Sequence, residues 1–156
     1  MRIHDLLDDE NILPQLRVSS KQEAIKSLIQ TLSMDINSNA KESCVKAVLE
    51  RESIMSTGVG KGLAIPHGKA RGLDKTYAAF AKLDPPIDYD AIDGEPVQLI
   101  FLLVGPETQN SLHIKMLSRI SRLLNSASFR EKLIESSTSH GIREAFRLEE
   151  EQFIRI

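Results

Sequence analysis

The chain of 156 residues has one cysteine, no tryptophan and few aromatic side chains, which make up 4% of it. A lone cysteine, Cys44, excludes a disulfide within the chain. Nothing near it has the CxxC or Cys/His spacing of a zinc site, so we expect no metal. The low cysteine content favours a reducing compartment, which predicts a cytoplasmic protein.

Long apolar runs and a strong charge of one sign are also absent. No segment approaches the roughly 18 consecutive apolar residues of a membrane-spanning helix, and the N-terminal stretch turns acidic at Asp8, Asp9 and Glu10. The formal net charge is -2 and the isoelectric point is near 6.1, so we expect no broad attraction to nucleic acid. The sequence therefore predicts no export, no membrane insertion and no nucleic-acid partner.

The composition is typical of an ordinary globular protein. Hydrophobic residues make up 41% of the chain and charged residues 27%. A chain of 156 residues is long enough to bury a core without a disulfide or a metal. There is no internal repeat, low-complexity tract or convincing linker. We expect a single domain over residues 1–156.

Two segments in the first third of the chain have the pattern of helices. Ser20 opens a capping box ahead of apolar residues at helical spacing, which predicts a helix over about residues 20–34. Asn39 is the expected cap of a second helix, which runs towards Arg51 and whose apolar stripe includes Cys44. On such a stripe Cys44 is expected to be a core thiol.

Three more helices are expected towards the C-terminus. Asn110 or Ser111 is the expected cap of a helix whose apolar face ends at Leu124. Ser128 opens another capping box and a further helix. Residues 140–153 have the pattern of a last helix.

Three strands are expected between these helices. Residues 63–65 form a short buried strand, and residues 76–83 form a second that stops at residues 84–86, because two prolines there cannot donate to a ladder. The apolar run over residues 97–104 is typical of a strand covered on both faces, and so of a central one. Together the elements predict an α/β (α+β) fold, a three-layer domain with a mixed β-sheet flanked by helices.

The most informative stretch is residues 56–69, which place one histidine, His67, just beyond a short apolar strand and behind a glycine-rich approach. Alternate glycines let the backbone come close to a ligand, and Pro66 fixes the chain immediately before the histidine. An imidazole presented in this way is a candidate nucleophile. Its reference pKa near 6.5 makes the neutral form the majority at neutral pH.

These residues resemble the active-site signature of the enzyme IIA family of the bacterial phosphotransferase system, fructose/mannitol type. The signature has an acidic or amide residue, a spacer, and then aliphatic-Gly-x-x-aliphatic-Ala-aliphatic-Pro-His-Gly. Its positions are filled here by Glu52, Val59-Gly60, Leu63-Ala64-Ile65 and Pro66-His67-Gly68. The likeness continues through residues 86–93, Pro96-Val97 and the helix that contains His113, so it covers nearly the whole chain. Among subfamilies, the nitrogen-regulatory enzyme IIA is the most similar.

The resemblance implies a phosphohistidine carrier. His67 is implied as the acceptor of a phosphoryl group from a histidine-phosphorylated carrier protein of the HPr type, on the nitrogen branch, with other proteins regulated by the phosphorylation state. His113 matches the second active-site histidine of the family, and Arg51 matches its active-site arginine, whose guanidinium pairs with phosphoryl oxygens. Such a chain is an enzyme in the formal sense of a phosphotransferase, with no cofactor and no small-molecule turnover of its own.

The glycine-rich loop suggests a further element of the site, inferred from the residues rather than from the resemblance. Backbone amides around Gly58, Gly60 and Gly62 are candidates for a phosphate-binding nest. Lys61 receives no role. The spacing GxxxxGK[ST] of nucleotide-binding loops is absent, so nucleotide binding is not expected.

Simpler structural interpretations exist for each of these residues. His67 could merely end a strand, His113 could be a surface or capping residue, and Arg51 could be an ordinary solvated charge. His4 and His140 are expected to be surface residues rather than ligands.

Three functional alternatives also remain. One is a sugar-specific fructose/mannitol enzyme IIA that passes the phosphoryl group to a IIB component. Another is a hydrolase or metalloenzyme that uses His67 and His113, although no HExxH or comparable cluster is present. The third is a regulatory binding module whose affinity for target proteins is set by phosphorylation.

Overall fold

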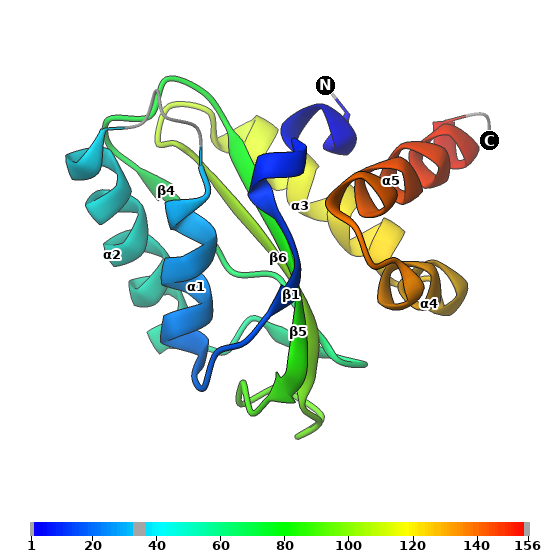
Figure 1. Ribbon diagram of the computed structural model, residues 1–156. Coiled ribbons are helices and arrows are strands. Elements are labelled where there is room, and N and C mark those ends of the chain that lie inside the picture. The colour runs from blue at the N-terminus through cyan, green and yellow to red at the C-terminus, as the bar shows by residue number, and fades with distance from the viewer. Residues whose placement is uncertain (1, 33–36, 155–156) are drawn as a thin grey trace.

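In the described part of the chain, six strands form one mixed sheet, with helices on both of its faces (Figure 1). The computed structural model describes residues 2–32 and 37–154. The strands are β1 (Ile12–Leu16), β2 (Gly58–Gly60), β3 (Leu63–Ala64), β4 (His67–Ala70), β5 (Tyr77–Ile87) and β6 (Val97–Pro106). The helices are α1 (Lys21–Gln30), α2 (Ser38–Ile54), α3 (Asn110–Leu124), α4 (Ala127–Glu135) and α5 (Ser139–Ile154), preceded by short 3-10 turns at Ile3–Leu6 and Asp9–Asn11.

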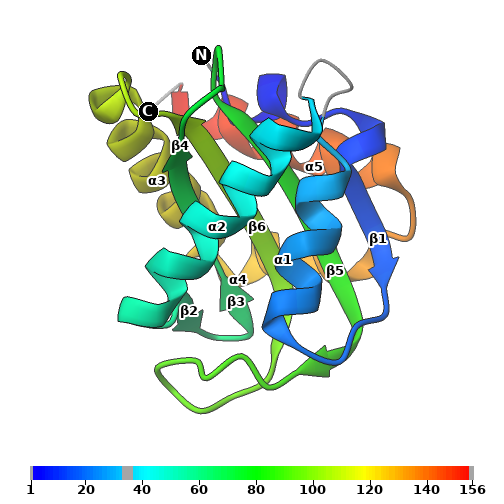
Figure 2. The same cartoon turned by 90° about the vertical axis from the view of Figure 1, so that its left-hand side faces the viewer.

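The sheet is organised around β6. Its strands run in the order β1-β5-β6-β3-β2, and β4 also pairs with β6. The pairs β1/β5, β3/β6 and β4/β6 are parallel, and β5/β6 and β2/β3 are antiparallel. In Figure 2, α1 and α2 lie across the front of the sheet, with β1 towards one edge and β2 and β3 towards the other. The predicted mixed α/β architecture and the central place of residues 97–104 are confirmed.

Side chains of the two long strands alternate between two cores, as the two-residue period of a strand requires. On one side, the core against α1 and α2 takes Ala79, Ala81, Leu83, Ile100, Leu102 and Val104. On the other side, the core against α3, α4 and α5 takes Ala78, Phe80, Leu99, Phe101 and Leu103. Here the Phe146 ring meets those of Phe80, Phe101 and Phe129 edge-on, with centroids 5.1 to 5.6 Å apart. Both faces of β6 are therefore buried.

Two predictions about the strands were wrong or incomplete. The strand that starts at Tyr77 does not stop at the prolines but continues to Ile87. Its partner β1 ends opposite Leu83, and the register with β6 shifts between Lys82 and Ile87. Pro85 and Pro86 fall in this interval, where no neighbouring strand requires a backbone N–H from them. The strands β1, β2 and β4 were not predicted. Pro14 fits within β1 because β1 is at the edge of the sheet.

The helices agree with the sequence in number and differ at their ends. The hydroxyl of Ser20 accepts from the Glu23 amide, as predicted, and α1 ends at Gln30. The predicted end of this helix, Met34, lies outside the described residues. The cap of α2 is Asn37 rather than Asn39, because its side chain accepts from the amide of Ala40.

The caps of the later helices differ as well. Ser126, not Ser128, caps α4, since its hydroxyl accepts from the Phe129 amide. The third helix starts at Asn110, one or two residues earlier than expected, and its N-cap is Gln109 rather than Asn110 or Ser111. The side chain of Asn110 instead accepts a 2.6 Å hydrogen bond from Nζ of Lys69, which ties this helix to β4.

His4 is not the surface residue that the sequence suggested. Its side chain is 12% exposed, and Nδ1 lies 2.8 Å from Oε1 of Glu150 in α5. The same buried carboxylate accepts from the amides of Ile3 and His4. The N-terminal turn is therefore fixed against α5. His140 is exposed, as expected, and Cys44 is a buried core thiol whose pKa burial raises to about 11.

Candidate functional site

His67 is the first residue of β4, and it follows a break between two segments that both pair with β6. Leu63 of β3 lies opposite Leu99, and His67 lies opposite Leu103. Between them, the carbonyl of Ile65 lies 2.9 Å from Nδ1 of His67. A carbonyl oxygen only accepts, so Nδ1 carries the proton and the lone pair is on Nε2. The ring is therefore held in the tautomer whose free nitrogen is Nε2.

The surroundings keep His67 neutral. Partial burial lowers its pKa below the ordinary value of 6.5, and the positive charge of Arg51 lowers it further. The carbonyl of Ile65 and the carboxylate of Glu52 act in the opposite direction. The net lowering leaves His67 a neutral imidazole, with its Nε2 lone pair available, at neutral pH.

His113 lies beside His67, in the first turn of α3. The ring centroids are 5.8 Å apart and the ring planes are inclined by 52°. His113 is only 5% exposed, and burial, with help from His67 and Lys69, lowers its pKa to about 4. This ring is therefore also neutral, so it carries one donor and one acceptor nitrogen. The two histidines that the sequence singled out are brought together.

Arg51 supplies a positive charge at the same place. It lies in the last turn of α2, and its Nη1 donates a 2.8 Å hydrogen bond to the Met55 carbonyl, which steadies the side chain. Arg51 and His67 line two adjoining hollows together. The guanidinium has five N–H donors, so one bond to Met55 leaves others to contact an anion beside His67.

The two hollows on either side of His67 are open and largely apolar at the rim. The first, of about 520 Å³, also contains Thr57, Gly58 and Leu117, and the second, of about 670 Å³, contains His113 and Lys69. Five exposed apolar side chains, which we call the apolar rim, line these hollows: Ile54, Met55, Val59, Ile92 and Ile114. Ile54 and Ile92 are each 81% exposed. Such a patch around a reactive group is typical of a protein-docking surface.

A buried carboxylate network supports the base of the first hollow. Glu52, 5% exposed, accepts hydrogen bonds from the Thr57 amide at 3.2 Å, the Thr57 hydroxyl, and the Tyr89 hydroxyl at 3.0 Å. Nζ of Lys21 lies 3.7 Å from the same carboxylate. Burial and the charge of Glu52 raise the pKa of Tyr89, so its phenol stays protonated as a donor. Glu52 thus orders the loop that leads to His67.

The sequence identified only part of this network. Glu52 occupies the acidic position of the signature, but nothing in the local pattern pointed to Thr57 or Tyr89 as its partners. Tyr89 is 37 residues away and reaches Glu52 only through the fold. The one available signal was that Tyr89 falls within the segment that shares the family likeness.

The glycines of the glycine-rich loop do not all lie at the same pocket. Gly58 lines the first hollow with His67, but its amide already donates to the Ser56 hydroxyl. Gly60 lines a separate pocket, and the Asp93 carboxylate accepts from the Lys61 amide in this loop. Gly62 is among the lining residues of neither hollow beside His67. The structure therefore brings Gly58, but not Gly60 and Gly62, to the histidine.

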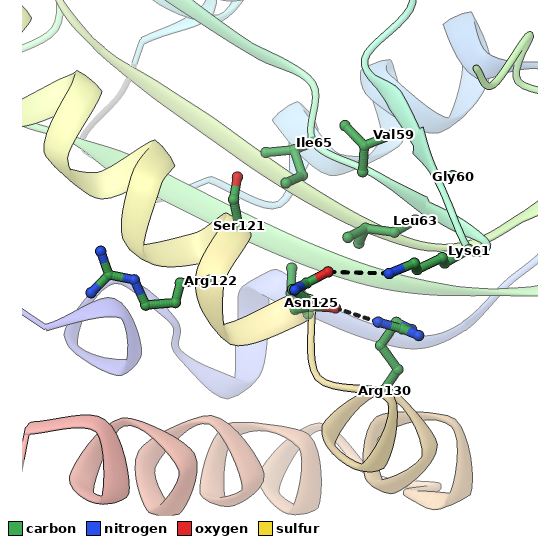
Figure 3. Close-up of a pocket in the computed structure, with 10 residues that line it drawn as sticks. Val59, Gly60, Lys61, Leu63, Ile65, Ser121, Arg122, Asn125 and Arg130 are labelled. Atoms are coloured by element: carbon green, nitrogen blue, oxygen red, sulfur yellow. Dashed lines mark hydrogen bonds between the residues drawn. The ribbon is translucent and has the colours of Figure 1, made fainter. Parts of the chain in front are cut away.

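That separate pocket, of about 430 Å³, lies between the β2–β3 turn and the end of α3, and we call it the lysine pocket (Figure 3). Lys61 and Arg130 approach the end of α3 from different elements. Nζ of Lys61 donates to Oδ1 of Asn125 at 3.3 Å, and Nη1 of Arg130 donates to the Leu124 carbonyl at 2.9 Å. Cations at a helix C-terminus stabilise its unpaired carbonyls and its dipole. Both cations therefore have a structural role.

Two further properties of the described residues bear on the class of protein. No group of three or more His, Cys, Asp or Glu side chains there could hold a metal ion. Within the same residues, no helix combines the length and the apolar character that crossing a membrane requires.

Comparison with known proteins gives concordant matches. A family profile described as "Phosphoenolpyruvate-dependent sugar phosphotransferase system, EIIA 2" matches residues 5–148. A nitrogen regulatory protein of Bradyrhizobium diazoefficiens is 41% identical over 142 residues, which is 91% of this chain and 92% of that protein. A fructose-specific EIIABC component of Bacillus subtilis is 32% identical over 142 residues, 91% of this chain but 22% of that protein. The crystal structure of the nitrogen regulatory protein IIA-Ntr from Neisseria meningitidis superposes with a TM-score of 0.86 at 31% identity, covering 92% of this chain and 98% of that one.

Proposed function

The chain belongs to the EIIA type 2 family of the phosphoenolpyruvate-dependent phosphotransferase system, and from this premise we propose that it is a phosphohistidine carrier with a regulatory role. His67 accepts a phosphoryl group from a histidine-phosphorylated carrier of the HPr type. The phosphorylated and unphosphorylated forms then differ in which proteins they bind. The observation that carries the proposal is a neutral His67, held through Nδ1, beside His113 and Arg51.

The transfer requires little covalent machinery. Nε2 of His67 attacks phosphorus as the N–P bond to the donor histidine breaks, so the phosphoryl group moves from one imidazole to another. No proton has to be removed, since the attacking nitrogen already has a lone pair. Catalysis then rests on position and on charge stabilisation at the equatorial oxygens. Arg51 supplies donors with a positive charge, and neutral His113 supplies one N–H.

The hydrogen bond to Ile65 also has a role after transfer. Phosphorylated on Nε2, the imidazole keeps its Nδ1 proton, and the Ile65 carbonyl continues to accept it at 2.9 Å. The same contact therefore suits both states of the ring. This arrangement allows the group to be held and returned without a change in the local backbone.

The apolar rim supports a docking role. A donor protein must cover the hollow to exclude water during transfer, and exposed apolar side chains around His67 offer that contact. A phosphoryl group adds nearly two negative charges at the centre of the same surface, which alters what can bind there. Regulation by phosphorylation state follows from this overlap of the acceptor and the docking surface.

A second candidate is supported by the fructose-specific relatives. The match to a fructose-specific component of Bacillus subtilis favours a sugar-branch enzyme IIA that passes the group on to a IIB component. The higher identity of the Bradyrhizobium protein favours the nitrogen branch. For the metalloenzyme alternative, the described part of the chain contains no group of three or more side chains that could hold a metal ion.

Transfer from two purified, radiolabelled phospho-carriers tests the proposal, one carrier from the nitrogen branch and one from a sugar branch. We expect label on the wild-type chain, fastest from the nitrogen-branch donor, and none on His67→Ala. His140→Ala, which removes an exposed histidine, is the matched control and should accept label normally. Label retained by His67→Ala would overturn the assignment of the acceptor. Faster transfer from the sugar-branch donor would favour the second candidate.

A further inference from the structure

Among the described residues, two buried side-chain polar atoms have no hydrogen-bond partner: Oγ1 of Thr76 and Nδ1 of His113. Thr76 is 3% exposed and His113 is 5% exposed, so water cannot readily replace the partner. A buried polar group without a partner costs roughly 1–3 kcal/mol, and native proteins retain few of them. Two such atoms beside the proposed acceptor call for a common explanation.

Both atoms lie against Gly105 in β6. A Cβ built on this glycine would stand 3.3 Å from Oγ1 of Thr76 and 3.6 Å from Nδ1 of His113. The antiparallel pairing of Tyr77 with Val104 sets Thr76 beside Gly105, and His113 follows from the helix after β6. The backbone of Gly105 is not left-handed, so its conformation does not require glycine. What glycine provides here is space between the hydroxyl and the imidazole.

The direction of the ring follows from this placement. Nδ1 of His113 faces Gly105 in the interior, which leaves the Nε2 edge for the hollow shared with His67. A neutral imidazole has one N–H and one lone pair, and the two tautomers differ in which nitrogen carries the proton. Only the tautomer with the proton on Nε2 donates towards His67. A donor to Nδ1 would select that tautomer.

We propose that Thr76 is a positioning residue for His113: its hydroxyl, which does not bond Nδ1 in the arrangement seen here, turns into the space left by Gly105, donates to Nδ1 and so keeps the imidazole proton on Nε2. The lowered pKa of His113, about 4, is consistent with a neutral ring. The inference rests on the proposed function for its purpose, since Nε2–H is then the donor to a phosphoryl oxygen on His67. The tautomer itself is a property of the unphosphorylated protein.

The direct test is the tautomer of His113 in the full-length, ¹⁵N-labelled protein, read from two-bond ¹H–¹⁵N correlations of the imidazole. We expect the proton on Nε2 and an Nδ1 resonance typical of a hydrogen-bond acceptor. In Thr76→Val, which keeps the shape of the side chain, the Nδ1 resonance should move because it loses its donor. Thr76→Ser restores the hydroxyl and should restore the wild-type resonance. Thr31→Val, whose hydroxyl otherwise bonds the Leu28 carbonyl, is the matched control and should leave His113 unchanged.

Phosphoryl acceptance provides the second readout. Thr76→Val should accept label roughly two- to tenfold more slowly than wild type, the range set by the net free energy of one hydrogen bond, and Thr76→Ser should be close to wild type. Gly105→Ala should slow transfer similarly, because its methyl group would take the space into which the Thr76 hydroxyl turns.

The outcomes separate the two proposals. A wild-type ring with its proton on Nδ1, or an Nδ1 resonance that does not move in Thr76→Val, would overturn the positioning role of Thr76 even if the chain accepts phosphoryl groups normally. A wild-type chain that accepts no label at His67 would overturn the carrier function and leave the tautomer result standing.

Discussion

The first hollow beside His67 and the lysine pocket share Val59, Ile65 and Ser121, yet the two regions differ in their chemistry. The lysine pocket holds more positive charge, but Lys61 and Arg130 are already bound to the end of α3. The side of the two histidines holds less charge and more unused bonding capacity: a free Nε2 on His67, and the N–H donors of Arg51 other than the one bonded to the Met55 carbonyl. In this molecule, nitrogen atoms that remain free to bond a ligand, rather than the amount of positive charge, distinguish the candidate site.

The difference extends to the support beneath each pocket. Under the His67 side, the Glu52 carboxylate is nearly inaccessible to water and collects donors from Thr57 and Tyr89. The lysine pocket is supported by helix-end contacts at the surface, where solvent competes. We therefore expect substitutions on the two sides to affect different measurements.

The largest effect is expected when Glu52 is removed. Glu52→Ala leaves buried donors of Thr57 and Tyr89 without an acceptor, and should lower the free energy of unfolding by about 2–4 kcal/mol. Urea unfolding followed by circular dichroism measures this. Glu107→Ala, which removes an exposed carboxylate, should change stability by no more than about 0.5 kcal/mol. Equal changes in the free energy of unfolding of both variants would mean that the Glu52 network does not stabilise the fold.

A second effect follows from the pKa of His113. The unfolded imidazole binds a proton near pH 6.5, whereas burial lowers the folded pKa to about 4. Between these values the unfolded chain binds more protons, so the folded state is destabilised as the pH falls. Between about pH 7 and about pH 4.5, His113 should contribute a loss on the order of 2 kcal/mol. Unfolding of His113→Gln should depend less on pH by this amount, and His140→Gln should match wild type. An unchanged pH dependence in His113→Gln would show that the ring is not held neutral by burial.

Arg51 and Arg71 provide a matched pair for the rate of transfer. Arg51→Ala should slow phosphoryl acceptance about tenfold, because a charge-assisted hydrogen bond to the transferring group is worth roughly 1.5 kcal/mol. Arg71, whose side chain is 91% exposed and lies 3.7 Å from the Glu107 carboxylate, should be replaceable by alanine without effect. Initial rates with labelled phospho-carrier measure the contrast. If both variants transfer at the wild-type rate, Arg51 has no role at the phosphoryl group.

The smallest effect is expected in the lysine pocket. Lys61→Ala and Arg130→Ala should each lower stability by about 0.3–1 kcal/mol, the contribution of a cation at a helix C-terminus. Neither should change the initial rate of phosphoryl transfer, because both side chains are hydrogen-bonded at the end of α3. Thermal unfolding and transfer rates of the same preparations test the two statements together. A transfer defect as large as that of Arg51→Ala would remove the distinction between the pockets.

The sequence was most informative where a local pattern decides the structure. Residues 97–104 had to be covered on both faces, because nothing along them is polar enough to face water except Gln98, and they form the centre of the sheet. The strands β2 and β4, which were not predicted, have three and four residues, so pairing with β3 and β6, rather than local preference, produces them. The caps at Asn37 and Ser126 each differ from the prediction by two residues, because several neighbouring side chains offer the same chemistry.

The same division applies to the candidate site. His67, Arg51 and His113 were accessible from the signature and the family likeness, and the fold places them around the same hollows. Thr76 and Gly105 have no signature. Their meeting with His113 is created by the register of β5 on β6 and by the start of α3, and such long-range pairing cannot be read from a local pattern.

The position of the phosphoryl group on the imidazole tests the central claim most directly. After transfer from a phospho-carrier, ³¹P and ¹⁵N spectra of the labelled protein distinguish the two ring nitrogens of each histidine. Because the Ile65 carbonyl holds the proton of Nδ1, the account predicts a single phosphohistidine, at Nε2 of His67. A phosphoryl group on Nδ1 of His67, or on any other residue, would contradict it.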